Sequence, residues 1–334
     1  ALTIDSLKAH GVDHINPSGA ETVDVPGAVA GWAALRSRFG TLSFRQLLAP
    51  AIYYAQNGFP LAERNARYWV APKLMQQPGY KETYVPNGVA PKVGDVFKNP
   101  ALANSLRQVA EHGRDAFYNG PMTRTMVTFL RAQGGMHTLA DFSQFQPEWV
   151  EPISTTYRGW TIYELPPNGQ GIAALAMLNI MEQFPMAQYG HNSVDALHVM
   201  IEAKKLAYAD LRRYIGDPKF SHIPVTGLLS PDYARDRAKL IDPQHANCDV
   251  SPGQPPAGDT TYLSVTDAQG NMVSLIQSNF QEFGSRLVAP GTGFVLQDRG
   301  ALFNLDPASP DVLAGHKRPL HTIMRKRRIL HHMP

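Results

Sequence analysis

The hydrophobic pattern of this chain changes abruptly near residue 260. Before about residue 241, apolar residues recur mostly at the spacing of three and four residues that amphipathic helices have. Residues 241–258 are rich in Pro, Gln, Asp, Asn and Gly, which is typical of an exposed loop. Residues 261–266 and 272–279 then have the Val, Leu, Ile, Ser and Thr content of β-strands. This order predicts an α+β protein whose helical first two thirds are followed by antiparallel strands.

Start and stop signals divide the helical part into separate helices. Proline at the beginning and glycine at the end delimit the segment 26–40, and Ser43 is an N-cap for the helix predicted over 43–58. The segment 172–184 is apolar on most sides, which predicts a buried helix. Further helices are expected at 102–111, 122–133, 141–145 and, as the longest, 193–214, with Val194, Leu197, Ile201 and Ala207 on its apolar stripe.

Two hairpins are predicted among the strands. The first joins 153–157 to 160–165, and 294–297 is a further strand candidate. The second turns at residues 267–271. Pairing Thr266 with Met272 and carrying that register outward sets Thr260 opposite Ser278, and opposed residues of an antiparallel pair project to the same face. The register therefore predicts two neighbouring hydroxyl groups at the open end of this hairpin.

Composition excludes several classes of protein. Apolar residues make up 43% of the 334 residues, which suffices for a core, and no run approaches the roughly 18 apolar residues of a membrane span. The single cysteine, Cys248, excludes a disulfide framework and a cysteine-cluster zinc site. The net charge of +3 comes from residues 316–334, which hold six Lys or Arg and no acid. Because the remaining chain is mildly acidic, we expect no nucleic-acid partner and interpret the basic tail as a solvated terminus.

Several catalytic motifs are absent by inspection, among them GxxxxGK[ST], GxGxxG after a strand, HExxH and GxSxG. Cys248 lies in a polar loop, and the sequence places no activating histidine beside it. His198 is interpreted as a hydrogen-bonded helix residue, because Glu202 is its only neighbour of a metal-ligating type. What remains is Gly258-Asp259-Thr260-Thr261, where a loop passes directly into a strand.

The segment that begins at Thr260 resembles the region around the nucleophile of the γ-glutamyltranspeptidase family, whose members are N-terminal-nucleophile hydrolases. It reads TTYLSVTDAQGNMVS, and the family's FGS and PGTG elements follow at 283–285 and 290–293. The similarity extends over roughly residues 20–320. Upstream matches in the same order are VPGAVAG at 25–31, FYNG at 117–120, GG at 134–135, YRG at 157–159, residues 203–210 and GDP at 216–218.

The resemblance implies a fold and a mechanism. The family fold is a sandwich of αββα layers, which we expect to be incomplete here because about five strand candidates are too few for two sheets. Self-cleavage between Asp259 and Thr260 would divide one composite domain into a large-subunit-like segment, 1–259, and the start of a small-subunit-like segment, 260–334. The Thr260 hydroxyl would be the nucleophile and its freed α-amine the general base, with Ser278 as support and with neither metal nor organic cofactor.

The substrate-binding positions depart from the glutathione-cleaving members. The family's Asn position falls on Phe280, with Asn279 beside it, the Gln or Glu position on Arg299, and the Asp position on Leu302. Leu302 removes the partner of a substrate ammonium, and Arg299 adds a cation that favours a carboxylate. We expect a γ-glutamyl or related acyl amide as donor, and the departures favour an acidic acyl group without an α-amine, as in glutaryl-cleaving acylases.

Both ends of the chain are expected to be truncated. Family members usually carry an earlier segment with a substrate-binding arginine and continue past Pro319 through a Gly-Gly oxyanion turn, whereas residues 323–334 do not resemble the family. The activity expected is that of a glutathione hydrolase-like amidase. The alternatives are an acylase of the glutaryl or cephalosporin type and a catalytically silent fragment. Water or an amine is the expected acceptor, the cleaved subunit is the expected protein partner, and the sequence, which shows no signal peptide, leaves cytoplasm and periplasm open.

Overall fold

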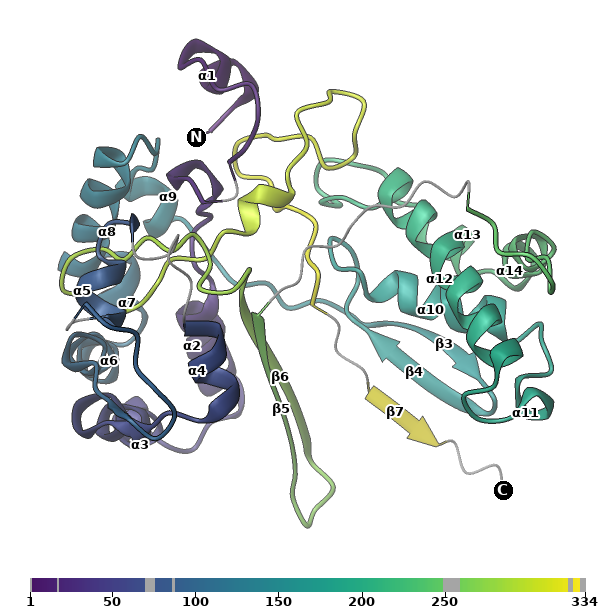
Figure 1. Cartoon of the computed structure of the whole chain (residues 1–334), viewed down its shortest axis with the longest axis horizontal. Coiled ribbons are helices and arrows are strands. Elements are labelled where there is room, and N and C mark those ends of the chain that lie inside the picture. Colours follow the sequence, from purple (N-terminus) through teal and green to yellow (C-terminus); the bar gives the residue numbers. More distant parts are fainter. Residues whose placement is uncertain are drawn as a thin grey trace. The chain divides into compact units, whose positions relative to one another are not determined.

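Figure 1 shows the computed structural model, which describes residues 2–16, 18–69, 76–85, 88–248, 259–323 and 327–330. The chain divides into two compact units. Unit 1 comprises residues 1–148, 257–260 and 278–301, and unit 2 comprises residues 149–256, 261–277 and 302–334. Each unit therefore combines sequence from before and after the proposed cleavage point. Within the described ranges, no helix is both long and apolar enough to cross a membrane.

Unit 1 is mainly helical, and α3 and α6 pack side by side in it (Figure 1). A short sheet pairs β1 (Phe59–Pro60) with β2 (Val96–Phe97). The five helices expected before residue 150 are confirmed, with ends within two residues of the predicted ones. The α-helices are α1 (Ile4–Ala9), α2 (Ala28–Phe39), α3 (Phe44–Asn57), α4 (Glu63–Trp69), α5 (Tyr80–Tyr84), α6 (Pro100–His112), α7 (Arg114–Tyr118), α8 (Pro121–Ala132) and α9 (Leu139–Ser143).

Local sequence explains where these helices begin and end. The Ser43 side chain accepts a hydrogen bond from the Gln46 N–H, and the Gln46 side chain bonds back to Ser43, which is a complete capping box for α3. Proline occupies the first turn of α6 and α8, where its missing N–H costs nothing. Gly40 follows the last residue of α2. Because these signals act locally, the sequence alone located α2, α3, α6 and α8, whereas α1, α4, α5 and α7 were not predicted.

The core of unit 1 includes residues from beyond position 280. Leu130 of α8 and Phe142 of α9 are buried in one apolar cluster with Leu287 and Leu296. Burying side chains of this size contributes roughly 1.5–3 kcal/mol each. The segment 278–301 is therefore part of the unit's core.

The PGTG segment docks on the beginning of α6. Asn99, the N-cap of α6, donates a side-chain hydrogen bond to the Gly293 carbonyl at 2.6 Å, and its Oδ1 accepts from the Leu102 N–H at 2.9 Å. Ser105 donates its hydroxyl to the Thr292 carbonyl at 2.7 Å. One side chain thus caps the helix and holds the glycine-containing segment against it.

In unit 2, helix α10 lies between a small sheet and helix α12 (Figure 1). Most residues of α10 (Gly171–Met181) are buried, which confirms the expected buried helix. The sheet has the order β3 (Ile153–Tyr157), β4 (Trp160–Glu164) and β7 (Arg327–Leu330), all antiparallel, and β3–β4 is the predicted hairpin. The other helices are α11 (Met186–Tyr189), α12 (Val194–Tyr214), α13 (Val225–Leu228) and α14 (Pro231–Ala238).

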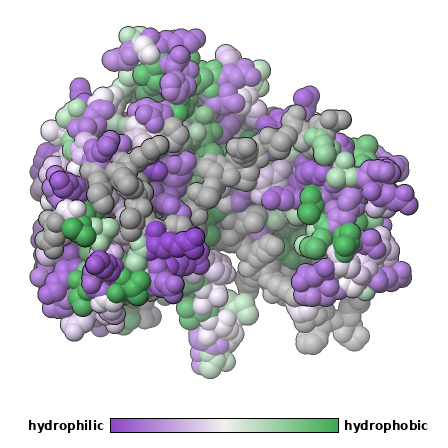
Figure 2. Space-filling view, in the orientation of Figure 1, coloured by the Kyte–Doolittle hydropathy of each residue, from purple (hydrophilic) through white to green (hydrophobic). Residues whose placement is uncertain are grey.

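Helix α12 has the predicted length but buries a different face. Val194, Leu197 and Ile201 are 83%, 42% and 55% exposed, so the expected apolar stripe is wrong apart from Ala207. The side chains that α12 buries include Ala196, Val199, Ala203, Leu206 and Leu211. Alanines allow α12 to approach α10 closely, which a stripe of larger side chains would prevent. Apolar (green) surface is visible over this part of unit 2 in Figure 2.

One further expectation needs correction. The strand candidate 294–297 forms only an isolated bridge, between Val295 and Val288, because the residues around it pack into the core without regular strand pairing. The tail contributes a strand that was not predicted, β7, whose residue Leu330 pairs with Trp160 of β4. Period-two patterns of four residues are too short to distinguish a strand from a buried loop.

The second predicted hairpin is confirmed as β5 (Asp259–Thr266) paired with β6 (Met272–Phe280). In its turn, the Asp267 N–H donates to the Asn271 carbonyl at 3.1 Å, and the Asp267 carboxylate accepts from the backbone N–H of Asn271 at 2.8 Å. The hairpin exposes several large apolar residues. These are Tyr262, Leu263, Val265, Met272 and Val273.

Candidate active site

The predicted nucleophile lies at the very start of β5. Asp259 is the first residue of the strand and Thr260 the second, so the backbone on either side of the proposed scissile bond is extended. Residues 241–248 of the predicted loop are irregular, and 249–258 lie outside the described residues. The transition from loop to strand was inferred from composition. The strand begins at Asp259, within two residues of the predicted position.

Ser278 lies near the end of β6, where its hydroxyl is held by a local contact. Its side chain is half-buried, and its Oγ accepts a hydrogen bond from the Phe280 N–H at 2.9 Å. At the turn, the pairing of Asp267 with Asn271 has the register predicted from sequence. Continued without a bulge to the open end, that register sets Thr260 opposite Ser278. The pairing of the two hydroxyls itself stays a prediction.

Phe280 is held in a strained backbone conformation. Its φ is +79°, a region that disfavours residues with a Cβ, at a cost of about 1–3 kcal/mol. Its ring is only 2% exposed, and the Arg299 guanidinium carbon lies 5.1 Å from the ring centroid. Burial and the cation–π contact stabilise the strained residue. In this structure the Phe280 side chain is thus a buried packing residue.

Arg299 interacts electrostatically with two carboxyl groups. It is 6% exposed, and it begins the short 3₁₀ helix Arg299–Leu302. Burial lowers the pKa of Arg299 to about 10, while the negative charges of Asp24 and Asp298 oppose that shift. Burial raises the pKa of Asp24 to about 7 and that of Asp298 to about 6. The guanidinium charge is therefore partly balanced inside the protein.

Asp24 and Asp298 are expected to contribute more to the stability of unit 1 as the pH falls from about 8 to about 5. Their pKa values are about 7 and 6 in the folded state, above the usual 3.8, so these two groups bind protons more tightly in the folded chain than in the unfolded chain. Asp24→Asn resembles the protonated form, so it should raise the thermal midpoint at about pH 8 and leave it unchanged at about pH 5. Thermal unfolding of the variant beside the wild type across this range measures the effect, and equal midpoints at about pH 8 would contradict it.

The remaining predicted positions lie around the same segment of sequence. Asn279 is exposed, and its carbonyl accepts a hydrogen bond from the Asp298 N–H at 3.1 Å. Leu302 is half-buried at the end of the 3₁₀ helix. Sequence reasoning missed Asp24 and Asp298. Asp298 directly precedes Arg299 in the sequence, and this adjacency could have identified it. Asp24 is far from Arg299 in the sequence and approaches it only in the folded chain.

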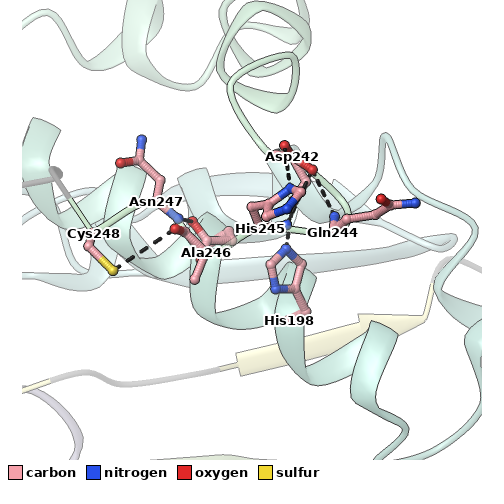
Figure 3. A network of polar contacts seen from close by, with 8 residues as sticks. His198, Asp242, Gln244, His245, Ala246, Asn247 and Cys248 are labelled. Atoms are coloured by element: carbon pink, nitrogen blue, oxygen red, sulfur yellow. Dashed lines mark hydrogen bonds and ion pairs between the residues drawn. The ribbon is translucent and has the colours of Figure 1, made fainter.

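The Cys248 alternative is not supported by its surroundings (Figure 3). The Cys248 sulfur is exposed and lies 3.9 Å from the Ala246 carbonyl oxygen. His198 Nε2 lies 2.7 Å from the Asp242 carbonyl oxygen, and His245 Nδ1 lies 3.1 Å from the Asp242 carboxylate. Figure 3 shows the sulfur at the opposite end of the network from both imidazoles. Within the described part of the chain, no hydrogen bond joins Cys248 to a histidine, and His198 is the hydrogen-bonded helix residue that was expected.

The family model of gamma-glutamyltranspeptidase matches residues 1–325. The chain belongs to the gamma-glutamyltranspeptidase family. This finding confirms the resemblance inferred from the motifs, and with it the place of the chain in the N-terminal-nucleophile hydrolase superfamily.

Individual relatives of the family carry different enzyme names. The chain is 38% identical to the glutathione hydrolase-like YwrD proenzyme of Bacillus subtilis over 304 residues, which is 90% of this chain and 57% of the relative. It is 37% identical to the oxamate amidohydrolase proenzyme of Klebsiella pneumoniae, covering 97% of this chain and 62% of the relative. The chain thus spans about three fifths of the length of these relatives.

A solved structure confirms the predicted fold class. The crystal structure of cephalosporin acylase from Bacillus halodurans superimposes with a TM-score of 0.89 at 40% identity, over 98% of this chain and 61% of that one. The α+β architecture of the family therefore applies to this chain, and helices followed by antiparallel strands are its observed order.

Proposed function

We propose that this chain is an amidase precursor that cleaves itself between Asp259 and Thr260. The observation that carries the proposal is the position of Thr260 at the start of β5 in a chain of this family. The Thr260 hydroxyl attacks the Asp259 carbonyl carbon, and the C–N bond breaks as the acyl group moves to oxygen. Water then hydrolyses the ester, which leaves a carboxylate on Asp259 and a free α-amine on Thr260.

The freed α-amine of Thr260 then acts as the general base in each catalytic cycle. An α-amino group titrates at about 7.7–8.0, so near neutral pH it can take the proton of the Thr260 hydroxyl. The oxygen attacks the substrate amide, the amine product leaves with that proton, and an acyl ester remains on Thr260. Water or an acceptor amine removes the acyl group. We assign Ser278 the role of supporting the nucleophile.

Contacts inside unit 2 support the proposal that both cleavage products stay together. The buried Asp217 carboxylate accepts hydrogen bonds from the Arg318 backbone N–H at 2.9 Å and from its guanidinium at 3.2 Å. The Asn168 side chain donates to the Pro319 carbonyl at 2.6 Å. These contacts join segment 1–259 to segment 260–334, so cleavage between Asp259 and Thr260 alone leaves them intact.

We propose an acyl group with an acid function but no α-amine as the preferred donor, and a γ-glutamyl group as the second candidate. Leu302 carries this preference, since an apolar side chain cannot pair with an ammonium. Arg299 supports the preference for an acidic acyl group less strongly, because Asp24 and Asp298 already balance part of its charge. The names of relatives, from glutathione hydrolase-like to cephalosporin acylase, support an amide bond as the target.

Glutaryl and γ-glutamyl 4-nitroanilides test the donor preference. We expect kcat/KM to be about tenfold higher for the glutaryl compound, because an unpaired ammonium costs about 1–2 kcal/mol. Leu302→Asp should shift the ratio toward the γ-glutamyl compound, and Leu302→Asn is the uncharged control. A wild-type preference for the γ-glutamyl compound would overturn the donor assignment, and turnover of neither compound would count against the amidase proposal.

A further inference from the structure

Asp298 forms hydrogen bonds with the backbone on either side of Phe280, at the end of β6. Its backbone N–H donates to the Asn279 carbonyl at 3.1 Å, and its Oδ1 accepts from the Gln281 N–H at 3.0 Å. Its side chain is 0% exposed. One buried residue thus satisfies two backbone groups that flank Phe280, as a neighbouring strand would in a sheet.

The backbone of residues 279–281 determines the position of the Ser278 hydroxyl. The Phe280 N–H donates to the Ser278 Oγ, so the position of that oxygen depends on how Phe280 is held. Phe280 has a φ of +79°, which a free chain would abandon. Because Asn279 and Gln281 are both bound to Asp298, the strained residue between them cannot relax to an ordinary conformation.

Charged groups lie near the Asp298 carboxyl group. Arg286 and Arg299 attract its negative charge, and that charge in turn raises the pKa of Asp24. The Asp298 Oδ2 is buried without a hydrogen-bond partner among the described residues. Among the described residues the carboxyl group is therefore held by the Oδ1 bond from the Gln281 N–H, and an amide oxygen in the same place could accept that bond equally well.

We propose that Asp298 is a positioning residue of the active site, which fixes the backbone of residues 279–281 and thereby the orientation of Ser278. This inference rests on the proposed function. It assigns Asp298 a geometric role, in which the place of its acceptor oxygen matters and its charge does not. Relocation of that oxygen by one methylene group should therefore be as harmful as its removal.

A set of variants of this chain tests the proposal. Amide hydrogen exchange of residues 279–284 and the rate of cleavage at residue 259 are measured for Asp298→Ala, Asp298→Glu and Asp298→Asn. We expect exchange to be about tenfold faster and cleavage about tenfold slower for the alanine and glutamate variants. Asparagine should keep both rates within about threefold of the wild type, because it retains the acceptor at the same distance.

Asp311→Ala is the matched control, because Asp311 is also a buried aspartate that accepts a backbone N–H, from Leu320. It should lower the thermal midpoint without selectively changing exchange at residues 279–284. Rescue by glutamate but not by asparagine would overturn the proposal, as would equal slowing of cleavage by the alanine variants of Asp298 and Asp311. If the wild type does not cleave at all, the proposed function fails, whereas the exchange rates still decide the positioning role.

Discussion

Gly293→Ala should lower the free energy of unfolding of unit 1 by roughly 3–5 kcal/mol, whereas Gly291→Ala should cost only about 1–2 kcal/mol. Both glycines belong to the PGTG segment, and their φ values are nearly equal, +74° and +72°. A Cβ at Gly293 would lie 2.2 Å from the Leu102 backbone nitrogen and 2.5 Å from the Asn99 Oδ1, but one at Gly291 would meet nothing within 4 Å. The two positions thus share the backbone strain and differ in available space.

The collision at Gly293 affects more than one interaction. A shifted Asn99 would lose its bond to the Gly293 carbonyl and its N-cap bond to Leu102, and a lost cap alone costs about 0.5–2 kcal/mol. Urea unfolding of the two variants beside the wild type measures the difference. Equal losses at both positions would show that backbone conformation alone explains the glycines of this motif.

Thr260→Ala should abolish self-cleavage completely. The substitution removes the oxygen that attacks the Asp259 carbonyl, and no other atom of residue 260 can form the ester. Thr261→Ala is the matched control, since it removes the same hydroxyl from the next residue of β5 and should leave cleavage intact. Ser278→Ala should slow cleavage without preventing it. Loss of cleavage in Thr261→Ala but not in Thr260→Ala would move the nucleophile by one residue.

Much of the fold could be predicted because its signals are local. The capping box of Ser43 and Gln46 and the turn residues from Asp267 to Asn271 act within a few positions of the chain. The buried face of α12 could not be predicted from its own pattern. Val194 and Ile201 fit a helical apolar stripe as well as Val199 and Leu206 do, and only the close approach of α10 decides between the faces.

The places of Thr260 and Ser278 on β5 and β6 could be predicted from the sequence, their reacting roles stay proposals, and the residues packed around them could not be predicted. Thr260 and Ser278 were identified from a motif and a strand register, both of which are contained in adjacent sequence. The cluster of Asp24, Asp298 and Arg299 depends on a contact between segments about 270 positions apart, for which Gln297 provides a hydrogen bond to the Asp24 carbonyl at 3.0 Å. Contacts of this kind leave no periodic pattern in the sequence.

Intact mass after incubation at neutral pH tests the central claim, that bond cleavage in front of a threonine creates the active amine. We expect the wild type to give two masses, those of residues 1–259 and 260–334, and Thr260→Ala to give one full-length mass. The expected pieces contain 259 and 75 residues of the 334. A wild-type chain that keeps its full-length mass, or that is cut at any other bond, would contradict the account.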